Sequence, residues 1–223
     1  MRKAWAEEQF SYRGKFYDYE DIALLPTPVQ KPSPPIYVAA ASPGSAEEAG
    51  RRGYAFACAQ FASTPTPAEA AAQIARYRQA YIDAGHGEPP DDLPHVFWTH
   101  VADSTAQALK EAEAGMKRKL GGATKVWVKP GVAGYETFAR IGQFLATATI
   151  EQLDALSIFG DPPRCVEKIR KYQAAGLSHL MVMFDWGGMP QQKIFHAMEL
   201  FAGEVMPHFA RNSKAEPLAA PAK

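Results

Sequence analysis

The apolar residues of this chain fall into short runs that alternate with longer, periodic segments. Four short runs, at residues 36–41, 54–59, 95–102 and 178–184, are almost continuously apolar. Runs of this kind are typical of strands that are buried on both faces of a parallel sheet. The segments between them carry apolar residues at helical spacing. The pattern therefore predicts four strand–helix units with right-handed crossovers.

Capping sequences mark where several of the predicted helices begin. Thr66-Pro67-Ala68-Glu69 is a capping box with proline at the first helical position. Thr149-Ile150-Glu151-Gln152 predicts a second box, and Asp161-Pro162 predicts another N-cap. The last predicted helix stops before Pro207 and carries an apolar stripe of Ile194, Met198, Phe201 and Val205.

The two ends of the chain and one internal segment depart from this rhythm. Aromatic residues around an Arg-Gly turn predict a short β-hairpin at 10–17, and the Pro-rich stretch 25–35 predicts a stiff connector. Glycines interrupt the pattern at 121–148, which is expected to be an inserted excursion. We therefore divide the chain into a hairpin with connector (1–35), a βα domain (36–210) and a disordered tail (211–223).

Four parallel strands are compatible with two architectures. They can form a small doubly wound sheet, although the glycine fingerprint of dinucleotide-binding folds is absent. They can also form half of a (β/α)8 barrel of the TIM type, which needs eight strands to close. A four-strand arc would leave two long edges unpaired, which natural proteins avoid. The pattern alone favours neither architecture.

Composition and charge argue against several classes of function. The 24 basic residues balance 24 acidic ones without any Lys/Arg run, so nothing favours nucleic acid or anionic lipid as a partner. Cys58 and Cys165 lie in apolar stretches and are interpreted as core residues. The six histidines show no metal-ligand spacing, so no metal site is predicted. Without a signal-peptide pattern or an apolar segment that could span a bilayer, a cytoplasmic location is expected.

The clearest chemical feature is the turn Ser42-Pro43-Gly44-Ser45, which follows the first predicted strand. A helix that begins here, with Ser42 as N-cap and Pro43 as its first residue, would direct backbone N–H groups and its positive dipole end at an anion. Gly44 would let a ligand approach the backbone, and the hydroxyls of Ser42 and Ser45 could donate to phosphate oxygens. The simpler interpretation is that Ser42 only caps the helix and Ser45 is a surface residue.

An ordered set of motifs resembles one known family. It begins with Phe10-x-x-x-Gly14-Lys15-Phe16-Tyr17 and with the Pro-rich connector into Ile36-Tyr37-Val38-Ala39-Ala40. It continues with Val101-Ala102-Asp103-Ser104-x-x-Gln107-Ala108 and Phe159-Gly160-Asp161-Pro162, and it ends with Met198-Glu199-Leu200-Phe201-x-x-Glu204-Val205-Met206-Pro207. In this order and spacing the motifs are similar to the carboxy-terminal half of the bacterial luciferase-like, flavin-dependent monooxygenases.

The resemblance implies a (β/α)8 barrel of which only the last four βα units are present. It implies reduced FMN as the cofactor, or in some branches the deazaflavin F420. Ser42, Gly44 and Ser45 match the stretch that holds the FMN phosphate in such enzymes, and Ala41 stands where some members have an acidic residue. The implied partners are O₂, a small organic substrate and a separate flavin reductase. In the implied reaction one oxygen atom goes to the substrate and the other to water.

The absent first half of the barrel leads to a hypothesis of another class. The chain would then be a non-catalytic, truncated fragment or a partner subunit of such an enzyme. Its unpaired edges would have to be covered by a complementary barrel half or by a second copy in a homodimer. Among enzymes, an F420-dependent oxidoreductase that transfers hydride without O₂ is the alternative that the resemblance leaves open.

Three further side chains are weak catalytic candidates. Trp98 and His100 share one face of the third predicted strand and would line a barrel mouth. Trp186, in the glycine-containing loop after the last strand, would cover an apolar substrate. Ordinary packing and a flexible loop are the simpler interpretations. His179 is expected at the amino end of its strand, away from such a mouth.

Overall fold

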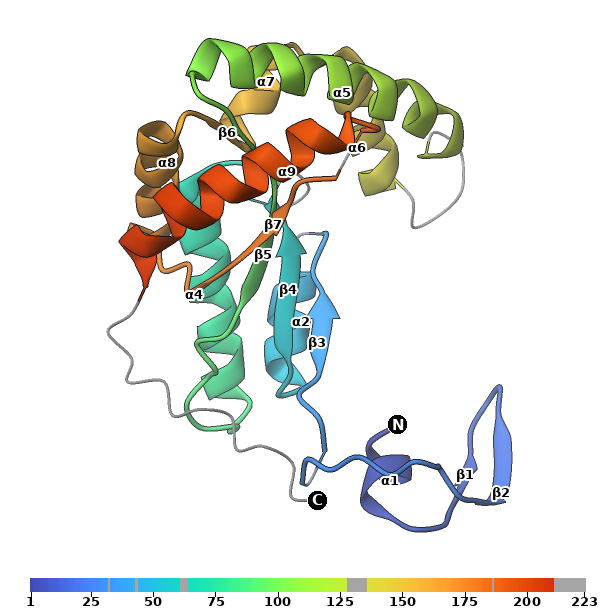
Figure 1. The fold of residues 1–223 in the computed structure, drawn as a ribbon. Coiled ribbons are helices and arrows are strands. Elements are labelled where there is room, and N and C mark those ends of the chain that lie inside the picture. Colours follow the sequence, from blue (N-terminus) through green and yellow to red (C-terminus); the bar gives the residue numbers. More distant parts are fainter. Residues whose placement is uncertain (32, 43, 61–63, 128–135, 186, 211–223) are drawn as a thin grey trace, which may run out of the picture.

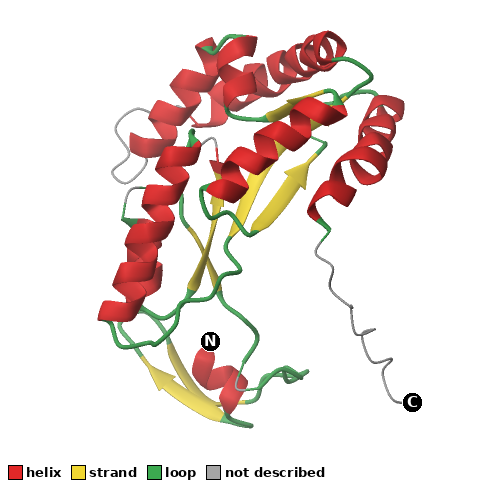
Figure 2. Ribbon diagram, turned by 90° about the vertical axis from the view of Figure 1, so that its left-hand side faces the viewer, coloured by secondary structure: helices red, strands yellow, loops and turns green. Residues whose placement is uncertain are grey.

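The computed structural model describes residues 1–31, 33–42, 44–60, 64–127, 136–185 and 187–210. Its main body is a parallel sheet with helices packed around it (Figures 1 and 2). A short helix, α1 (Arg2–Ala6), and an antiparallel pair of strands, β1 (Phe10–Arg13) and β2 (Asp18–Ile22), lie below this body in Figure 1. The predicted hairpin is thus present, but its second strand lies at Asp18–Ile22, beyond the predicted end at residue 17.

The main sheet contains all four predicted strands. They are β3 (Tyr37–Ala39), β4 (Ala55–Ala59), β5 (Pro94–Val101) and β7 (His179–Met183). β3 pairs with β4, β4 pairs with β5, and β7 pairs with the amino-terminal part of β5, all in parallel. A fifth strand, β6 (Ile158–Gly160), pairs with the carboxyl end of β5. The apolar pattern missed β6 because three residues are too few to stand out between two helices.

Helices surround this sheet on one face and at one end. The face that we call the outer face is covered by α2 (Ser45–Arg51), α4 (Pro67–Asp83) and α8 (Pro162–Ala174). Beyond the carboxyl ends of the strands lie α5 (Thr105–Trp127), α6 (Glu136–Thr147) and α7 (Ile150–Ala155), at the top of Figure 1. The last helix, α9 (Gln191–Leu200), packs against β5.

The predicted helix starts are largely confirmed. Thr66 and Thr149 each form a complete capping box, with Glu69 and Gln152 respectively. The Asp161 carboxylate accepts a hydrogen bond from the Arg164 backbone N–H at 3.1 Å. Each of these polar residues satisfies an N–H group that has no partner within its own helix.

Two expectations about helices are wrong. The predicted excursion at 121–148 is largely helical, because α5 continues to Trp127 and α6 covers Glu136–Thr147. Glycines inside a helix reduce its stability without ending it. The last helix also does not stop before Pro207, since a π turn at Phe201–Val205 and a 3₁₀ turn at Met206–Phe209 extend it. The buried stripe runs through Ala197, Phe201 and Val205, and the predicted stripe residue Met198 is 46% exposed. The predicted tail at 211–223 lies outside the described residues.

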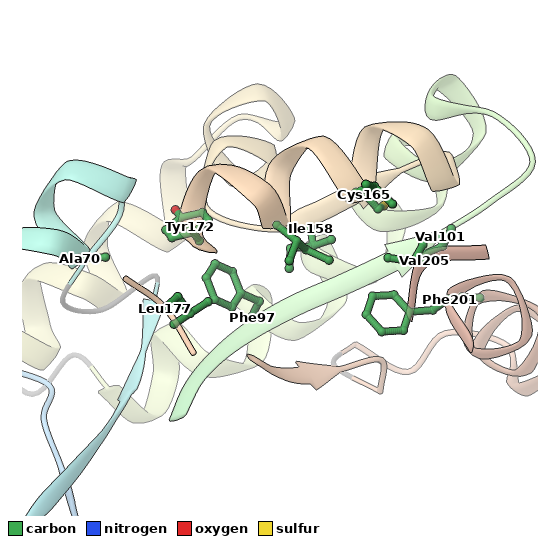
Figure 3. Packing of buried hydrophobic residues seen from close by; sticks show 12 residues of the cluster. Ala70, Phe97, Val101, Ile158, Cys165, Tyr172, Leu177, Phe201 and Val205 are labelled. Atoms are coloured by element: carbon green, nitrogen blue, oxygen red, sulfur yellow. The ribbon is translucent and has the colours of Figure 1, made fainter. Parts of the chain in front are cut away.

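The outer face of the sheet carries a dense apolar core. Phe97 and Val101 of β5 face Tyr172 and Cys165 of α8 in Figure 3. The rings of Phe97 and Tyr172 meet edge to face, with centroids 4.8 Å apart. Burial raises the pKa of the Cys165 thiol to about 12, which leaves it protonated and unreactive. Cys58 is also buried, so both cysteines are core residues as predicted.

The opposite face, which we call the inner face, is more open at β3 and β7, whereas Trp98 and His100 of β5 are buried there. Strand alternation places Tyr37, Ala57, Trp98 and Met181 on this side. In the described part of the chain the sheet does not close on itself, and β3, β6 and β7 each pair with one neighbouring strand only. None of the helices described there is both long enough and apolar enough to cross a membrane.

Candidate functional site

The turn after β3 has a different geometry from the one predicted. α2 begins at Ser45, and its N-cap is Gly44, whose φ of 84° lies in the left-handed region. The prediction of Ser42 as N-cap is therefore wrong, because the chain changes direction at Gly44 and the helix starts after it. Pro43 lies outside the described residues. Ala41 is half-buried between β3 and this turn.

The two serines of the turn bind each other. The Ser45 hydroxyl donates to the Ser42 carbonyl oxygen at 2.6 Å and accepts from the Ser42 backbone N–H at 3.2 Å. The Ser45 backbone N–H also donates to that carbonyl, at 3.2 Å. The Ser45 hydroxyl would have to release its bond before it could donate to a ligand. Ser42 and Ser45 thus fix the shape of the turn.

Space and backbone donors are present in front of α2. Gly44 is exposed, and a side chain at this position would meet no atom of the described residues within 4 Å. The first-turn N–H groups of Ala46 and Glu47 have no partner within the helix and are directed out of its amino end. A small anion can therefore approach the backbone at Gly44.

Acidic residues follow directly in α2, yet arginines neutralise them. Glu48 accepts from Arg52 at 2.6 Å and from Arg51 at 2.9 Å, and the hydrogen bond from Arg52 is the largest cause of its lowered pKa. Glu47 accepts from Arg76 at 2.9 Å. The carboxylates are therefore paired, and the helix dipole remains favourable to an anion at the turn.

The predicted candidate His100 belongs to a polar network at the carboxyl end of β5. Its Nε2 lies 2.8 Å from a Glu111 carboxylate oxygen, and the other Glu111 oxygen accepts from Lys193 Nζ at 2.8 Å. Burial lowers the pKa of His100 more than the Glu111 carboxylate raises it, so the imidazole is neutral near pH 7. A neutral ring next to a carboxylate carries its proton on Nε2 and donates it to Glu111.

Glu111 stays ionised in spite of its burial. Desolvation would raise its pKa, but hydrogen bonds from Lys193, His100 and Gln107 outweigh this effect and lower the pKa below the usual range. Three donors on one carboxylate fix its orientation and therefore that of His100. The network links β5, α5 and α9.

A cavity of about 580 Å³ adjoins this network. It lies between α5 and the start of α9, and its lining includes Gln107, Lys110, Glu111, Met189 and Lys193. Met189 also packs in the apolar cluster that surrounds Trp98, which is only 2% exposed. The cavity therefore has one wall of charged residues. Met189 forms part of its apolar lining and connects it to the cluster that contains Trp98.

Other predicted residues play smaller parts. Trp186 lies outside the described residues. Gly187 approaches α5 so closely that a side chain there would collide with the Gly115 backbone, so this glycine serves packing. His179 is at the amino end of β7, as predicted, and its Nδ1 lies 2.5 Å from Asp92, which also binds the Tyr37 hydroxyl. In the described residues no three His, Cys, Asp or Glu side chains gather as metal ligands would.

Sequence reasoning found His100 and Trp98 but not the groups that position His100. Glu111 lies 11 residues after His100 on the next helix, and Lys193 lies far along the chain on α9, so only the tertiary fold brings the three together. One signal was available: Gln107 and Glu111 are four residues apart, and such residues share a helix face. The 42–45 turn and the His100 network both lie at carboxyl ends of strands, with β4 between β3 and β5.

Comparison with known proteins adds three kinds of similarity. Residues 1–179 match the luciferase-like monooxygenase family. An F420-dependent glucose-6-phosphate dehydrogenase of Kineococcus radiotolerans is 24% identical over 213 residues, which are 93% of this chain and 57% of that protein. The chain thus spans little more than half the length of this relative.

Solved structures share the fold. Monooxygenase RslO1 of Streptomyces bottropensis superposes with a TM-score of 0.69 at 23% identity, over 94% of this chain and 58% of that one. The oxygenating constituent of 3,6-diketocamphane monooxygenase of Pseudomonas putida, solved in complex with FMN, gives a TM-score of 0.63 at 20% identity, over 92% and 60%. The parallel sheet therefore resembles that of luciferase-like TIM-barrel enzymes.

Proposed function

The chain belongs to the luciferase-like monooxygenase family, and we propose that it holds the phosphate of reduced FMN at the 42–45 turn to oxygenate a small organic substrate. The observation that carries this proposal is the turn itself. An exposed glycine with positive φ stands at the amino end of a helix and at the carboxyl end of a parallel strand. Folds of this class keep their ligands at that end of the sheet.

The residues of the turn fit a phosphate group. The backbone N–H groups of Ala46 and Glu47 would supply donors, the Ser42 hydroxyl would supply another, and the described residues leave space beside Gly44. The Ser45 hydroxyl supports the turn by binding the Ser42 carbonyl. When bound, reduced FMN would supply the two electrons by which O₂ gives one oxygen atom to the substrate and one to water. A separate flavin reductase would provide the cofactor in its reduced form.

The chain's own residues would orient the substrate. The cavity beside Glu111 and Lys193 offers polar groups at one wall, and Met189 offers an apolar surface. His100, held neutral by burial and oriented by Glu111, would present a fixed polar group near the carboxyl end of β5. Trp98 would keep water away from that side of the site.

F420 is a second candidate cofactor, because the Kineococcus relative is named as an F420-dependent dehydrogenase. F420 also carries a phosphate, so the same turn would hold it. The reaction would then remove hydride and a proton from an alcohol carbon and hydroxyl, without O₂. A third reading, of another class, is that the chain is a non-catalytic fragment or partner subunit. It is motivated by the 57% coverage of the relative.

Cofactor titration tests these proposals. We expect FMN or F420 to bind in a 1:1 ratio, and Gly44→Val and Ser42→Ala/Ser45→Ala to weaken binding at least tenfold, which corresponds to about 1.4 kcal/mol. Ser104→Ala is the matched control, because Ser104 precedes α5 at the same end of the sheet and should leave binding unchanged. Fluorescence titration measures the affinity.

The outcomes separate the candidates. Substrate-dependent O₂ consumption with reduced FMN supports the monooxygenase, and alcohol-dependent reduction of F420 supports the dehydrogenase. If both turn variants bind the cofactor as tightly as the wild type does, the 42–45 turn is not the phosphate site. A folded chain that binds neither cofactor would support the non-catalytic subunit.

A further inference from the structure

The cavity beside Glu111 lies between two helices that each contribute a cationic side chain. Its volume of about 580 Å³ is in the range of small-molecule sites. Lys110 lines it from α5, and Lys193 lines it from the first turn of α9, whose amino end lies close to α5 in Figure 1. Because α5 follows β5 and α9 follows β7, and these strands pair with each other, the walls of the cavity come from neighbouring units of the sheet.

Small residues on α5 leave room in this cavity. Ala106 and Ala114 lie one helical turn before and after Lys110, and both line the cavity. Pro190, the N-cap of α9, lines it as well, and its side chain offers no hydrogen bond to the start of that helix. A ligand can therefore approach Lys110 and the amino end of α9 together.

Lys110 carries a positive charge that the described residues do not neutralise. The two glutamates that follow it on α5 have other partners. Glu111 binds Lys193 at 2.8 Å. Glu113 binds Lys117 at 2.6 Å. In the part of the chain that the structure describes, no aspartate or glutamate forms an ion pair with Lys110, so its ammonium group is available to a ligand.

Hydrogen bonds already occupy the Glu111 carboxylate. One of its oxygens accepts from His100 Nε2 at 2.8 Å, and the other accepts from Lys193 Nζ at 2.8 Å. Gln107 Nε2 donates to the second oxygen at 3.3 Å. The Lys193 ammonium has three N–H donors, and Glu111 takes one of them. Occupied carboxylate oxygens and spare ammonium donors together favour a negatively charged ligand over a cation.

Two further features fit an organic anion. The first turn of α9 contains no acidic residue, so nothing in that turn offsets the positive end of its dipole. Met189 is buried, lines the cavity and packs in the cluster around Trp98. An apolar part of a ligand can therefore lie against Met189 while its charged group faces the two lysines.

We propose that this cavity binds an organic oxyanion, whose carboxylate or phosphate group contacts Lys110 and Lys193 and whose apolar part lies against Met189. That this anion is the substrate rests on the proposed function, whereas its binding does not. Carboxylate and phosphate groups share the negatively charged oxygens that lysines bind, and matched probes distinguish them.

Titration calorimetry of the full chain without cofactor tests this proposal, with hexanoate, hexyl phosphate and uncharged hexanol as probes. At least one of the two anions should bind roughly tenfold more tightly than hexanol, which lacks the charge. Lys110→Met should weaken that binding roughly fivefold or more, because it removes the unpaired ammonium group. The matched control is Lys171→Met on α8, which removes the same charge from an exposed side chain (61%) outside the cavity and should change nothing.

Circular dichroism should show that both lysine variants are folded, as expected for exposed side chains. Gly44→Val distinguishes the cavity from the 42–45 turn, because binding in the cavity should not change in this variant. The proposal is wrong if neither anion binds more tightly than hexanol, or if Lys110→Met binds the anion as tightly as the wild type does. Loss of anion binding in Gly44→Val would assign the anion to the turn and also overturn it. Because no cofactor enters this titration, its failure would leave the cofactor proposal standing.

Discussion

The two faces of the sheet differ sharply in how completely this chain covers them. On the outer face Phe56, Phe97 and Val101 are fully buried under helices. On the inner face Tyr37 is 39% and Met181 is 44% exposed. Strand β4 shows the contrast within five residues, since its Phe56 and Cys58 point outward while alanines alternate on the inner side.

This contrast indicates that the residues that stabilise the fold and the residues of the candidate sites lie in different parts of the sheet. The outer face has all the partners that a stable βα layer needs, so it can fold with what the chain provides. On the inner face the residues of β3, β4 and β7 are small or partly exposed, whereas Trp98 and His100 of β5 are buried. This is the side that a closed barrel fills with side chains from all its strands. The candidate sites lie at the carboxyl ends of the strands.

The largest expected effect comes from truncating a side chain on the outer face. Phe97→Ala should reduce the free energy of unfolding by about 3–5 kcal/mol, because it leaves a cavity against Tyr172 and Cys165. Met181→Ala on the inner face is the matched change and should cost less than about 1 kcal/mol in the monomer. Urea denaturation measures both. Equal losses would mean that the two faces do not differ in packing.

Lowering the pH should destabilise the folded chain through two buried histidines of β5, one on each face of the sheet. Burial lowers the pKa of His95 on the outer face and of His100 on the inner face. Each histidine therefore binds a proton more readily in the unfolded chain than in the folded one. The free energy of unfolding should be highest above the pKa of an unfolded histidine, about 6.5, and should fall as the pH falls below that value.

Single variants sharpen that prediction. Glu111 opposes the lowering of the His100 pKa, whereas the one polar partner of His95 among the described residues is the Leu93 carbonyl. His95→Gln should therefore flatten the pH dependence of stability more than His100→Gln does. Denaturation midpoints between pH 5 and 8 measure this, and a wild type whose stability does not change across that range would refute the account of both histidines.

The smallest effect compares two hydroxyl residues at helix starts. Thr66→Ala removes a capping box and should cost about 1 kcal/mol. Ser42→Ala should change stability by less than about 0.5 kcal/mol, because the Ser42 side chain does not cap α2. Thermal denaturation of both variants measures the difference. A capping loss at Ser42 would show that α2 starts two residues earlier in solution.

Prediction from the sequence succeeded where the signal was local and failed where it was not. The strands β3, β4, β5 and β7 and the capping boxes depend on runs or pairs of neighbouring residues. The start of α2 depends on the positive φ angle of Gly44. A glycine can adopt this angle, but its presence in the sequence does not show that it does. β6 gains its strand geometry only by pairing with β5, and α6 lies in a stretch whose glycines suggested a loop.

The candidate site divides in the same way. Ser42, Gly44 and Ser45 are adjacent in the chain, and alternation along β5 put Trp98 and His100 on one face. The Glu111–Lys193 pair that orients His100 could not be predicted, since α5 and α9 are brought together only by the fold. Their contact is set by tertiary packing, which neither periodicity nor spacing records.

The central claim is that the packed outer face and the centre of the sheet at β5 form the stable part of this chain. Hydrogen exchange of backbone amides tests it most directly. β5, which has partners on both sides, should exchange slowly. The amides of β3 and β7, which each pair with one strand in the described residues, should exchange faster. Amides of β3 and β7 that are as protected as those of β5 would contradict the claim.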